Sequence, residues 1–312
     1  MTLSPLAGAF DLDSPTLRVV AAVAEYGSIT RAAAVLGFSQ PALSQQLKRV
    51  EARIGMPLVT RSGRGIRLTD AGEVLARHAT DVLAALDAAA GELSDLAGLR
   101  AGRVRLAAFP SASSTIVPRL IRAIGVEHPG LEITYVEAEP PEAVAGVRDG
   151  VSDLAIAFRH PADRNDPFEA SAEGLVVHEL ARDDVLLLAP AEHPALAGGG
   201  PVDLAALRAE NWIAGCPRCR GHLLDSCARA GFAPTISFET DNFVAVMSMV
   251  AAGLGVALLP ALAVDAVPLP PGVVARRTAA GDHRMLVAVM RPAGDHIPAV
   301  AETLRLLPGL MR

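Results

Sequence analysis

Three short amphipathic segments follow a leader of about 14 residues. In each of them, apolar residues recur at three- and four-residue intervals, which is the period of a helix. Breaks fall at Gly27 and Gly37, and Ser28 and Ser39 stand where helix N-caps belong. The pattern therefore predicts three helices, over Pro15–Glu25, Ser28–Leu36 and Ser39–Ile54.

The pattern then changes to a short alternation and to one long helix. Ile66 and Leu68 alternate with polar residues behind a glycine-containing turn, which predicts a hairpin, or wing, at residues 61–69. The helix predicted over 70–97 repeats apolar residues at intervals of four and three, the rhythm of a coiled-coil seam. We expect this seam to pair with a second chain, and packing on its own domain is the alternative. The apolar residues of the seam are Leu75, Ala79, Val82, Leu86, Ala89, Leu93 and Leu96.

Beyond a short hinge at residues 98–102, apolar runs of strand length alternate with helical patterns. The helical patterns begin near Val117 and cover Pro141–Asp149. Such alternation predicts an α/β architecture with parallel strands joined by helical crossovers. The expected strands are Val104–Ala108, Leu131–Val136, Asp153–Phe158, Val185–Ala189, Trp212–Ala214, Ile236–Glu239, Val256–Leu259 and Leu286–Val289.

One uncharged run, Phe243–Val264, is long enough in principle to cross a bilayer. Gly253, Gly255 and Pro260 interrupt it, and no basic cluster flanks it. Strands covered on both faces also form continuous apolar runs. We therefore expect a buried helix, a glycine turn and a buried strand, and no membrane partner.

Charge separates the two parts of the chain. The net charge is −6, yet eight basic and two acidic residues lie between Thr16 and Thr69, whereas the remainder carries 20 basic and 32 acidic residues. A basic head on an acidic body is typical of a DNA-binding regulator. The 51% hydrophobic content excludes a disordered chain.

The third helix carries the pattern expected of a DNA-reading helix. Leu43, Leu47, Val50 and Ile54 form one apolar stripe, and the opposite face is polar. Such polar side chains hydrogen-bond base edges and phosphates in a major groove. A solvated polar face is the alternative. We predict base contacts from Gln40, Pro41 and Ser44, phosphate contacts from Arg31, Lys48, Arg61 and Arg64, and further DNA contacts from Ser28, Thr30, Ser39 and Gln45.

Residues 17–72 closely resemble the DNA-binding domain of LysR-type transcriptional regulators. The marks are GSITRAAAVLGFSQPALSQQLKRVEARIG, a Leu-Val-x-Arg lead into the wing, and LTDAG at the start of the long helix. Val59 stands where the family usually has Phe, which is a mild departure. DGVSDLAIAF and GLGVALLP in the C-terminal half also resemble this family.

This resemblance implies a winged helix-turn-helix at 15–69, a linker helix at 70–97 and an effector-binding domain at 103–312. That domain should consist of two Rossmann-like α/β subdomains, like a type 2 periplasmic binding protein. Subdomain I would cover about 103–178 and 284–312, and subdomain II about 179–283. Family members commonly pair their linker helices and form homodimers and homotetramers. The implied partners are a pseudo-palindromic promoter site in double-stranded DNA, a small-molecule effector and RNA polymerase.

Ligands of open α/β sheets collect where strands end, and the family places its effector in the cleft between subdomains. Serine hydroxyls after the first strand suit a polar or anionic group, and Arg159 could clamp a carboxylate. Local capping is the alternative for each residue. The candidate effector contacts are Ser111, Ser113, Phe158, Arg159, Gly215, Cys216, Asp241 and Asn242.

The three cysteines are Cys216, Cys219 and Cys227, too few for a disulfide framework. A helix over 219–227 would hold its end residues about 12 Å apart, beyond the roughly 7 Å that a disulfide spans, whereas Cys216 and Cys219 could meet. We expect a structural role, with no metal and no resident cofactor. A redox-sensing transcription factor is the alternative function, and a zinc site completed by His222 is a further alternative.

Enzyme motifs are missing from the sequence. It contains no G-x-S-x-G and no P-loop, and no set of nucleophile, base and orienting residue is visible around its histidines. We therefore expect no enzyme activity. The N-terminus has no basic region ahead of an apolar stretch, so we expect no signal peptide and a cytoplasmic location.

Overall fold

The computed structural model describes residues 12–62, 65–96, 102–164 and 166–311. The chain divides into two compact units, Met1–Leu93 and Ser94–Arg312, and each is described by itself.

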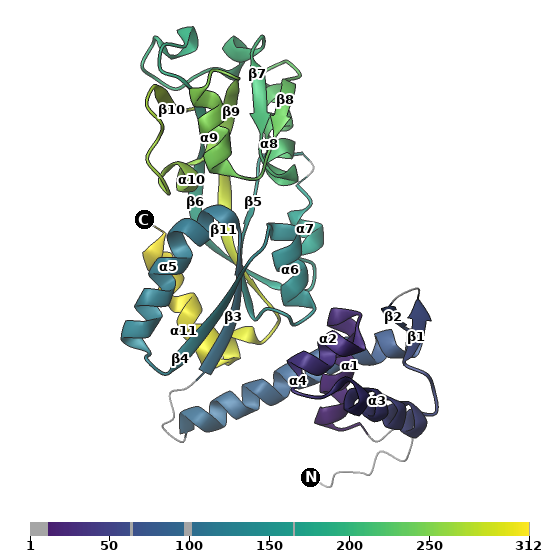
Figure 1. The fold of residues 1–312 in the computed structure, drawn as a ribbon. Helices are drawn as coiled ribbons and strands as arrows, with labels where there is room; N and C mark the ends of the chain where they lie inside the picture. The colour runs from purple at the N-terminus through teal and green to yellow at the C-terminus, as the bar shows by residue number, and fades with distance from the viewer. Residues whose placement is uncertain (1–11, 63–64, 97–101, 165, 312) are drawn as a thin grey trace. The chain divides into compact units, whose positions relative to one another are not determined.

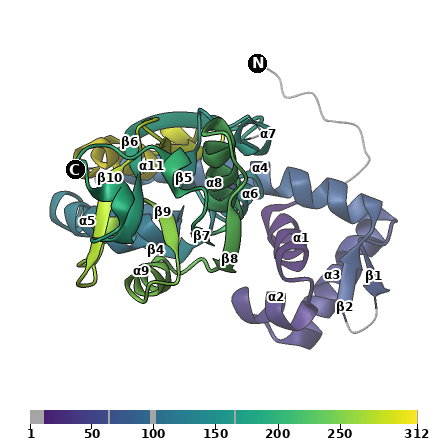
Figure 2. The same ribbon diagram turned by 90° about the horizontal axis from the view of Figure 1, so that it is seen from above.

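The N-terminal unit is a three-helix domain with a two-stranded wing, grouped around the start of a long helix (Figures 1 and 2). Leu17, Leu43, Leu47 and Val50 pack in its core. The expected helices and hairpin are confirmed, with ends that differ by at most two residues. The elements are α1 (Ser14–Tyr26), α2 (Ile29–Val35), α3 (Gln40–Ile54), β1 (Val59–Ser62), β2 (Gly65–Leu68) and α4 (Asp70–Leu96).

Local sequence explains these boundaries. The hydroxyls of Ser28 and Ser39 cap α2 and α3 by accepting backbone N–H groups of the first turn. Gly72 allows α4 to pass over the chain before the wing, because a Cβ there would lie 2.1 Å from the carbonyl oxygen of Leu58.

The apolar seam of α4 divides into two parts. Leu75 and Ala79 are 8% and 0% exposed in the core of the winged domain, so their expected role in pairing is wrong. Val82 and Leu86, one and two turns further on, are 46% and 45% exposed. Leu93 and Leu96 lie on the helix, but their side chains are outside the described set.

The C-terminal unit is built on one mixed sheet with the strand order β4-β3-β5-β11-β6-β9-β7-β8, and β10 pairs with β6. The β3–β4, β3–β5, β7–β8 and β7–β9 pairs are parallel, as expected. Pairs that involve β6 or β11 are antiparallel, so the sheet is mixed and the expected parallel pairing covers only part of it. The strands are β3 (Gly102–Ala108), β4 (Leu131–Glu137), β5 (Leu154–Arg159), β6 (Val176–Pro190), β7 (Asn211–Ala214), β8 (Thr235–Glu239), β9 (Val256–Pro260), β10 (Val273–Arg277) and β11 (His283–Met290).

Helices pack on both ends of this sheet and, together with its strands, form two α/β halves. The expected two-subdomain architecture is therefore confirmed (Figure 1). The helices are α5 (Pro110–Glu127), α6 (Pro140–Arg148), α7 (Phe168–Ser171), α8 (Pro217–Arg229), α9 (Phe243–Ala251), α10 (Ala261–Val264) and α11 (Pro298–Leu306), with short 3-10 turns at Pro194–Leu196, Leu204–Leu207, Gly294–His296 and Leu307–Leu310.

The long strands β6 and β11 connect the two halves (Figure 1). The first part of β6 pairs with β11, and its second part pairs with β9 and β10 in the other half. The sequence predicted only 185–189 and 286–289 in these places, because polar residues interrupt the apolar pattern near the crossing. The chain thus passes twice through the junction where the halves meet.

Two segments test the sequence patterns closely. The uncharged run forms the expected helix, α9, and the expected strand, β9, and it ends in a short helix, α10, that was not expected. No described helix is both long and apolar enough to span a membrane. Helix α5, by contrast, begins at Pro110 and not near Val117, because proline is favoured in a first helical turn. The serines expected in a free turn therefore lie in the first turns of α5.

Candidate DNA-binding face and effector cavity

The outer face of α3 presents polar groups that could contact DNA. Gln40, Pro41, Gln45 and Lys48 are exposed, and Ser44 is half-buried. The Gln40 amide donates to the Ser44 hydroxyl at 3.0 Å, which orients both side chains at the N-terminal end of the helix. This is the part of a recognition helix that reaches base edges.

The other predicted DNA contacts flank this face. Thr30 and Arg31 are exposed on α2, and the hydroxyls of Ser28 and Ser39 are used as helix caps. Arg61 lies on β1 without a described side chain, and Arg64 lies outside the described residues. Arg53, another cation of α3, pairs with Asp13 and so stabilises the packing of α1 on α3.

A cavity of about 420 Å³, part of it open to solvent, lies at the junction of the two α/β halves. Segments far apart in the sequence supply its walls. The sequence-predicted residues among them are Ser111, Phe158, Gly215, Cys216 and Asp241, and the others include Phe109, Glu139, Cys219, Thr240, Phe243 and Arg284.

Arg284 organises one wall of this cavity. Its side chain is buried, and its guanidinium donates to the Asp183 carboxylate at 2.9 Å and to the Ser111 hydroxyl at 2.8 Å. The guanidinium carbon also lies over the rings of Phe158 and Phe109, 4.4 and 4.7 Å from their centroids. These contacts fix the Arg284 guanidinium in the wall of the cavity and hold the Ser111 hydroxyl oxygen towards it.

Three predicted effector contacts do not line this cavity. The hydroxyl of Ser113 donates to the carbonyl of Phe109 at 2.9 Å and accepts from Tyr135. Arg159 forms ion pairs with two glutamates, and the Asn242 side chain caps α9. Local capping, the alternative considered, describes Ser113 and Asn242 better, whereas Arg159 is held in ion pairs, which was not considered.

The charged groups of the cavity wall are not those of an anion-binding site, which would offer an unpaired cation. Burial, and then the neighbouring Cys216 and Asp241, raise the pKa of Glu139 to about 8. Arg284 is the only cation among the described lining residues, and Asp183 neutralises it. The wall therefore offers carboxyl groups and hydroxyls in place of an unpaired positive charge.

Two cysteines meet at the same wall. Cys216 is the N-cap of α8 and Cys219 lies in its first turn, with the two sulfur atoms 3.2 Å apart. The hydrogen bond from Cys216, followed by the positive charges of Arg284 and Arg218, lowers the pKa of the Cys219 thiol, whereas the pKa of Cys216 is raised by this hydrogen bond and by burial. Cys227 lies at the far end of α8, buried in a different part of the core.

The sequence reasoning missed Arg284, and a signal for it was present. Arg284 is in phase with Leu286, Ala288 and Met290, which all face the buried core. A charged residue on the core side of an alternating strand needs a buried partner or a ligand.

The chain joins a winged helix-turn-helix to an α/β unit of two halves with a cavity where the halves meet. This combination defines a DNA-binding transcriptional regulator with an effector domain. Two family models match, one described as a bacterial regulatory helix-turn-helix protein of the LysR family over residues 15–73, and one as a LysR substrate binding domain over residues 97–310. The chain belongs to the LysR family of transcriptional regulators.

Individual relatives agree with this assignment. The chain is 30% identical over 293 residues to the probable HTH-type transcriptional regulator LrrA of Synechococcus elongatus, covering 93% of this chain and 95% of that protein. It is 32% identical over 254 residues to a probable hydrogen peroxide-inducible genes activator of Streptomyces viridosporus, covering 80% of this chain and 78% of that protein. Full-length OxyR of Pseudomonas aeruginosa has a similar fold, with a TM-score of 0.73, 24% identity and 96% coverage of both chains.

Proposed function

We propose that this regulator responds to a small organic effector bound in the cavity around Ser111 and Arg284. The observation that carries the proposal is the hydrogen bond between these two residues. Because the Ser111 oxygen accepts from the guanidinium, its own O–H remains free to donate to a ligand. Apolar rings with a few converging polar groups line the cavity, as in typical sites for small organic ligands.

The chemistry of the wall favours a ligand with an apolar body and a hydrogen-bond donor such as an amine. Phe109, Phe158 and Phe243 supply apolar surface, and Glu139 and Asp241 supply carboxyl groups that accept hydrogen bonds. A ligand with several carboxylates would meet the Asp241 carboxyl group without an unpaired cation to offset the repulsion. Glu139, whose pKa is raised to about 8, is protonated at neutral pH and can donate as well as accept.

DNA recognition in this proposal uses α3 of two or more chains. The exposed Val82 and Leu86 of α4 support pairing between linker helices, and paired winged domains would bind a pseudo-palindromic promoter site. Gln40, Pro41 and Ser44 would contact bases, while Arg31 and Lys48 contact phosphates.

The same proposal leaves the chain without an enzymatic role and without a resident organic cofactor. The cavity walls supply no histidine to act as a base for Ser111 or Cys219. A regulator of promoters acts where the chromosome is, so we place its work in the cytoplasm, with RNA polymerase as the partner that its bound form affects.

A thermal-shift screen of the full-length chain tests the effector proposal. Matched sets of small amines, alcohols and carboxylates, including dicarboxylates, would be compared at equal concentration. We expect stabilisation by members of the amine or alcohol sets, and loss of the shift in Ser111→Ala. Stabilisation by carboxylates alone would contradict the proposed ligand class.

A second candidate function is redox sensing, which the 3.2 Å separation of the Cys216 and Cys219 sulfurs favours. The Cys219 thiolate would attack a hydroperoxide, form a sulfenic acid and release an alcohol or water. The Cys216 thiol would then displace water from that sulfur to give a disulfide. The relative from Streptomyces viridosporus is named for hydrogen peroxide, which supports this candidate.

Mass spectrometry of peroxide-treated protein decides the redox candidate. We expect a 216–219 disulfide at mild oxidant, and no disulfide to Cys227, because α8 holds Cys219 and Cys227 about 12 Å apart. Full recovery of free thiols at all three positions would remove this candidate.

A further inference from the structure

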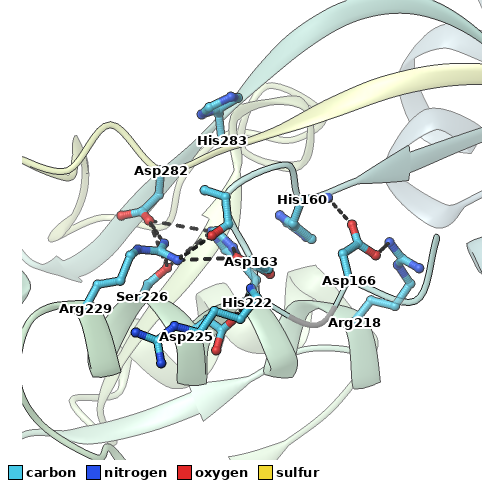
Figure 3. A network of polar contacts seen from close by, with 12 residues as sticks. His160, Asp163, Asp166, Arg218, His222, Asp225, Ser226, Arg229, Asp282 and His283 are labelled. Carbon is cyan, nitrogen blue, oxygen red and sulfur yellow. Dashed lines mark hydrogen bonds and ion pairs between the residues drawn. The ribbon is translucent and has the colours of Figure 1, made fainter. Parts of the chain in front are cut away.

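A cluster of histidine and aspartate side chains lies where the loop after β5 meets helix α8 (Figure 3). His160 and Asp163 belong to the loop, and His222 belongs to α8. One nitrogen or oxygen atom from each of the three lies within 4.8 Å of the other two. His160 and His222 are only 3% and 2% exposed, so this group of atoms is shielded from water.

His160 is the unusual member of the cluster. Its ring stacks on His222, with centroids 4.1 Å apart, and packs edge-on against Phe158. Within the described part of the chain, neither of its ring nitrogens has a hydrogen-bond partner, and no dashed line reaches the ring in Figure 3. Buried polar atoms are nearly always paired in folded proteins, so this imidazole calls for a ligand.

We propose that His160, Asp163 and His222 bind a divalent transition-metal ion of the zinc class. Two imidazole nitrogens and one carboxylate oxygen form a ligand set that Zn²⁺ and its neighbours prefer over Mg²⁺ or Ca²⁺.

His222 is already supported as a metal ligand would be. Its Nδ1 lies 2.8 Å from the Asp163 carboxylate, which accepts from it when Nδ1 carries the proton, and its Nε2 faces the Ser226 hydroxyl at 3.4 Å and the Asp282 carboxylate at 3.9 Å. An ion placed between Nδ1 and Asp163 would move the ring proton to Nε2. Ser226 and Asp282 could then accept it, in the manner of the carboxylate groups that orient metal-binding histidines.

The surrounding charges leave room for a dication. The cluster contains three carboxylates, those of Asp163, Asp166 and Asp282, and two guanidiniums, those of Arg218 and Arg229.

Binding requires one of the two histidine rings to turn, because parallel stacked rings do not aim their lone pairs at one point. His160 is the freer ring to turn, because its nitrogens make no hydrogen bond of normal geometry and only the backbone of His283 lies near them.

Such an ion would tie together two walls of the effector cavity. Phe158, which precedes the loop, lines the cavity, and so do Cys216 and Cys219 at the start of α8. The metal proposal is independent of the organic effector, because none of the three proposed ligands lines that cavity.

Titration of the EDTA-treated full-length chain with CoCl₂ and ZnCl₂ tests the metal site. The experiment uses a Cys216→Ser, Cys219→Ser background, since the two thiols would otherwise bind the same ions. We expect one tightly bound ion per chain, with visible Co²⁺ absorption of a nitrogen and oxygen site and no thiolate charge-transfer band. Calorimetry with ZnCl₂ should give the same stoichiometry.

His160→Phe and Asp163→Asn should each weaken binding by about tenfold or more, and His296→Ala, at an exposed histidine outside the cluster, should leave it unchanged. Phenylalanine keeps the ring stacking, and His160→Gln serves if His160→Phe does not fold. Zinc binding that is equally tight in all variants, or no binding of either ion at micromolar concentrations, would overturn the proposal.

Discussion

The guanidinium of Arg284 donates to the hydroxyl oxygen of Ser111 at 2.8 Å and joins strand β11 to the first turn of α5 across the wall of the effector cavity. This contact connects the crossing strands to the ligand site. Ser111 differs in this respect from the neighbouring Ser113 and Ser114. Their hydroxyls donate to the backbone carbonyls of Phe109 and Pro110.

Ser111→Ala should abolish the response to effector and spare DNA binding in the absence of effector. The substitution removes the O–H that faces the ligand but leaves the helix intact. Gel shift across an effector series, with a compound found in the thermal screen, measures the response. Ser114→Ala is the matched control, because Ser114 lies on the same helix, outside the cavity. Equal dose–responses of the two variants would argue against the assignment of Ser111.

Arg284→Met should lower the free energy of unfolding by about 3–5 kcal/mol, because it leaves the Asp183 carboxylate buried without its cation. Adding Asp183→Asn should restore most of that loss, since the amide oxygen still accepts from the backbone N–H of Leu262. Urea denaturation measures both changes.

The matched control for this ion pair is Arg277→Met. Arg277 pairs with Asp184 at 2.7 Å, but its side chain is 72% exposed, so its loss should cost less than about 1 kcal/mol. Equal midpoints for Arg284→Met and Arg277→Met would show that burial of the Arg284 pair has no energetic consequence.

Leu86→Lys on α4 should weaken pairing between chains and leave the winged domain folded. Leu86 is 45% exposed, and it continues the apolar seam beyond the part that packs on its own domain. Sedimentation velocity should show a shift towards smaller species. Leu75→Ala, at a buried position of the same helix, should instead reduce stability without that shift. An unchanged oligomer distribution in Leu86→Lys would exclude this face as the interface.

The fold follows from sequence patterns wherever one period dominates a segment. Caps and apolar stripes specified α1 to α4, and continuous apolar runs specified β5, β7 and β9. Strands β6 and β11 were underestimated because Asp183 and Arg284, a buried ion pair, interrupt their apolar pattern. The alternation of β11 marks Arg284 as a buried charge, but a sequence does not show which charge meets which across 101 residues. The partner of Arg284 and the positions of Arg284 and Glu139 at the cavity could therefore not be predicted.

Glu139 should make stability depend on pH. Its pKa in the folded chain is raised from 4.5 to about 8, chiefly by burial. Because the folded state favours the protonated carboxyl, its contribution is fully present below pH 4.5 and is lost as pH rises through about 8. Urea midpoints at pH 5 and pH 9 should therefore differ more for the wild type than for Glu139→Gln. Glu142→Gln, at an exposed position of α6, is the control and should behave like the wild type.

The most direct test of the account is binding of the full-length chain to DNA from its own upstream region, measured by fluorescence anisotropy over a series of salt concentrations. We predict preference for this fragment over a scrambled one, and weakening with salt. Gln40→Ala should reduce the preference, at a cost of about 1–3 kcal/mol on the specific fragment alone. Lys48→Ala should weaken binding to both fragments and reduce the salt slope by about one. Equal affinity for the two fragments, unaffected by Gln40→Ala, would contradict the account.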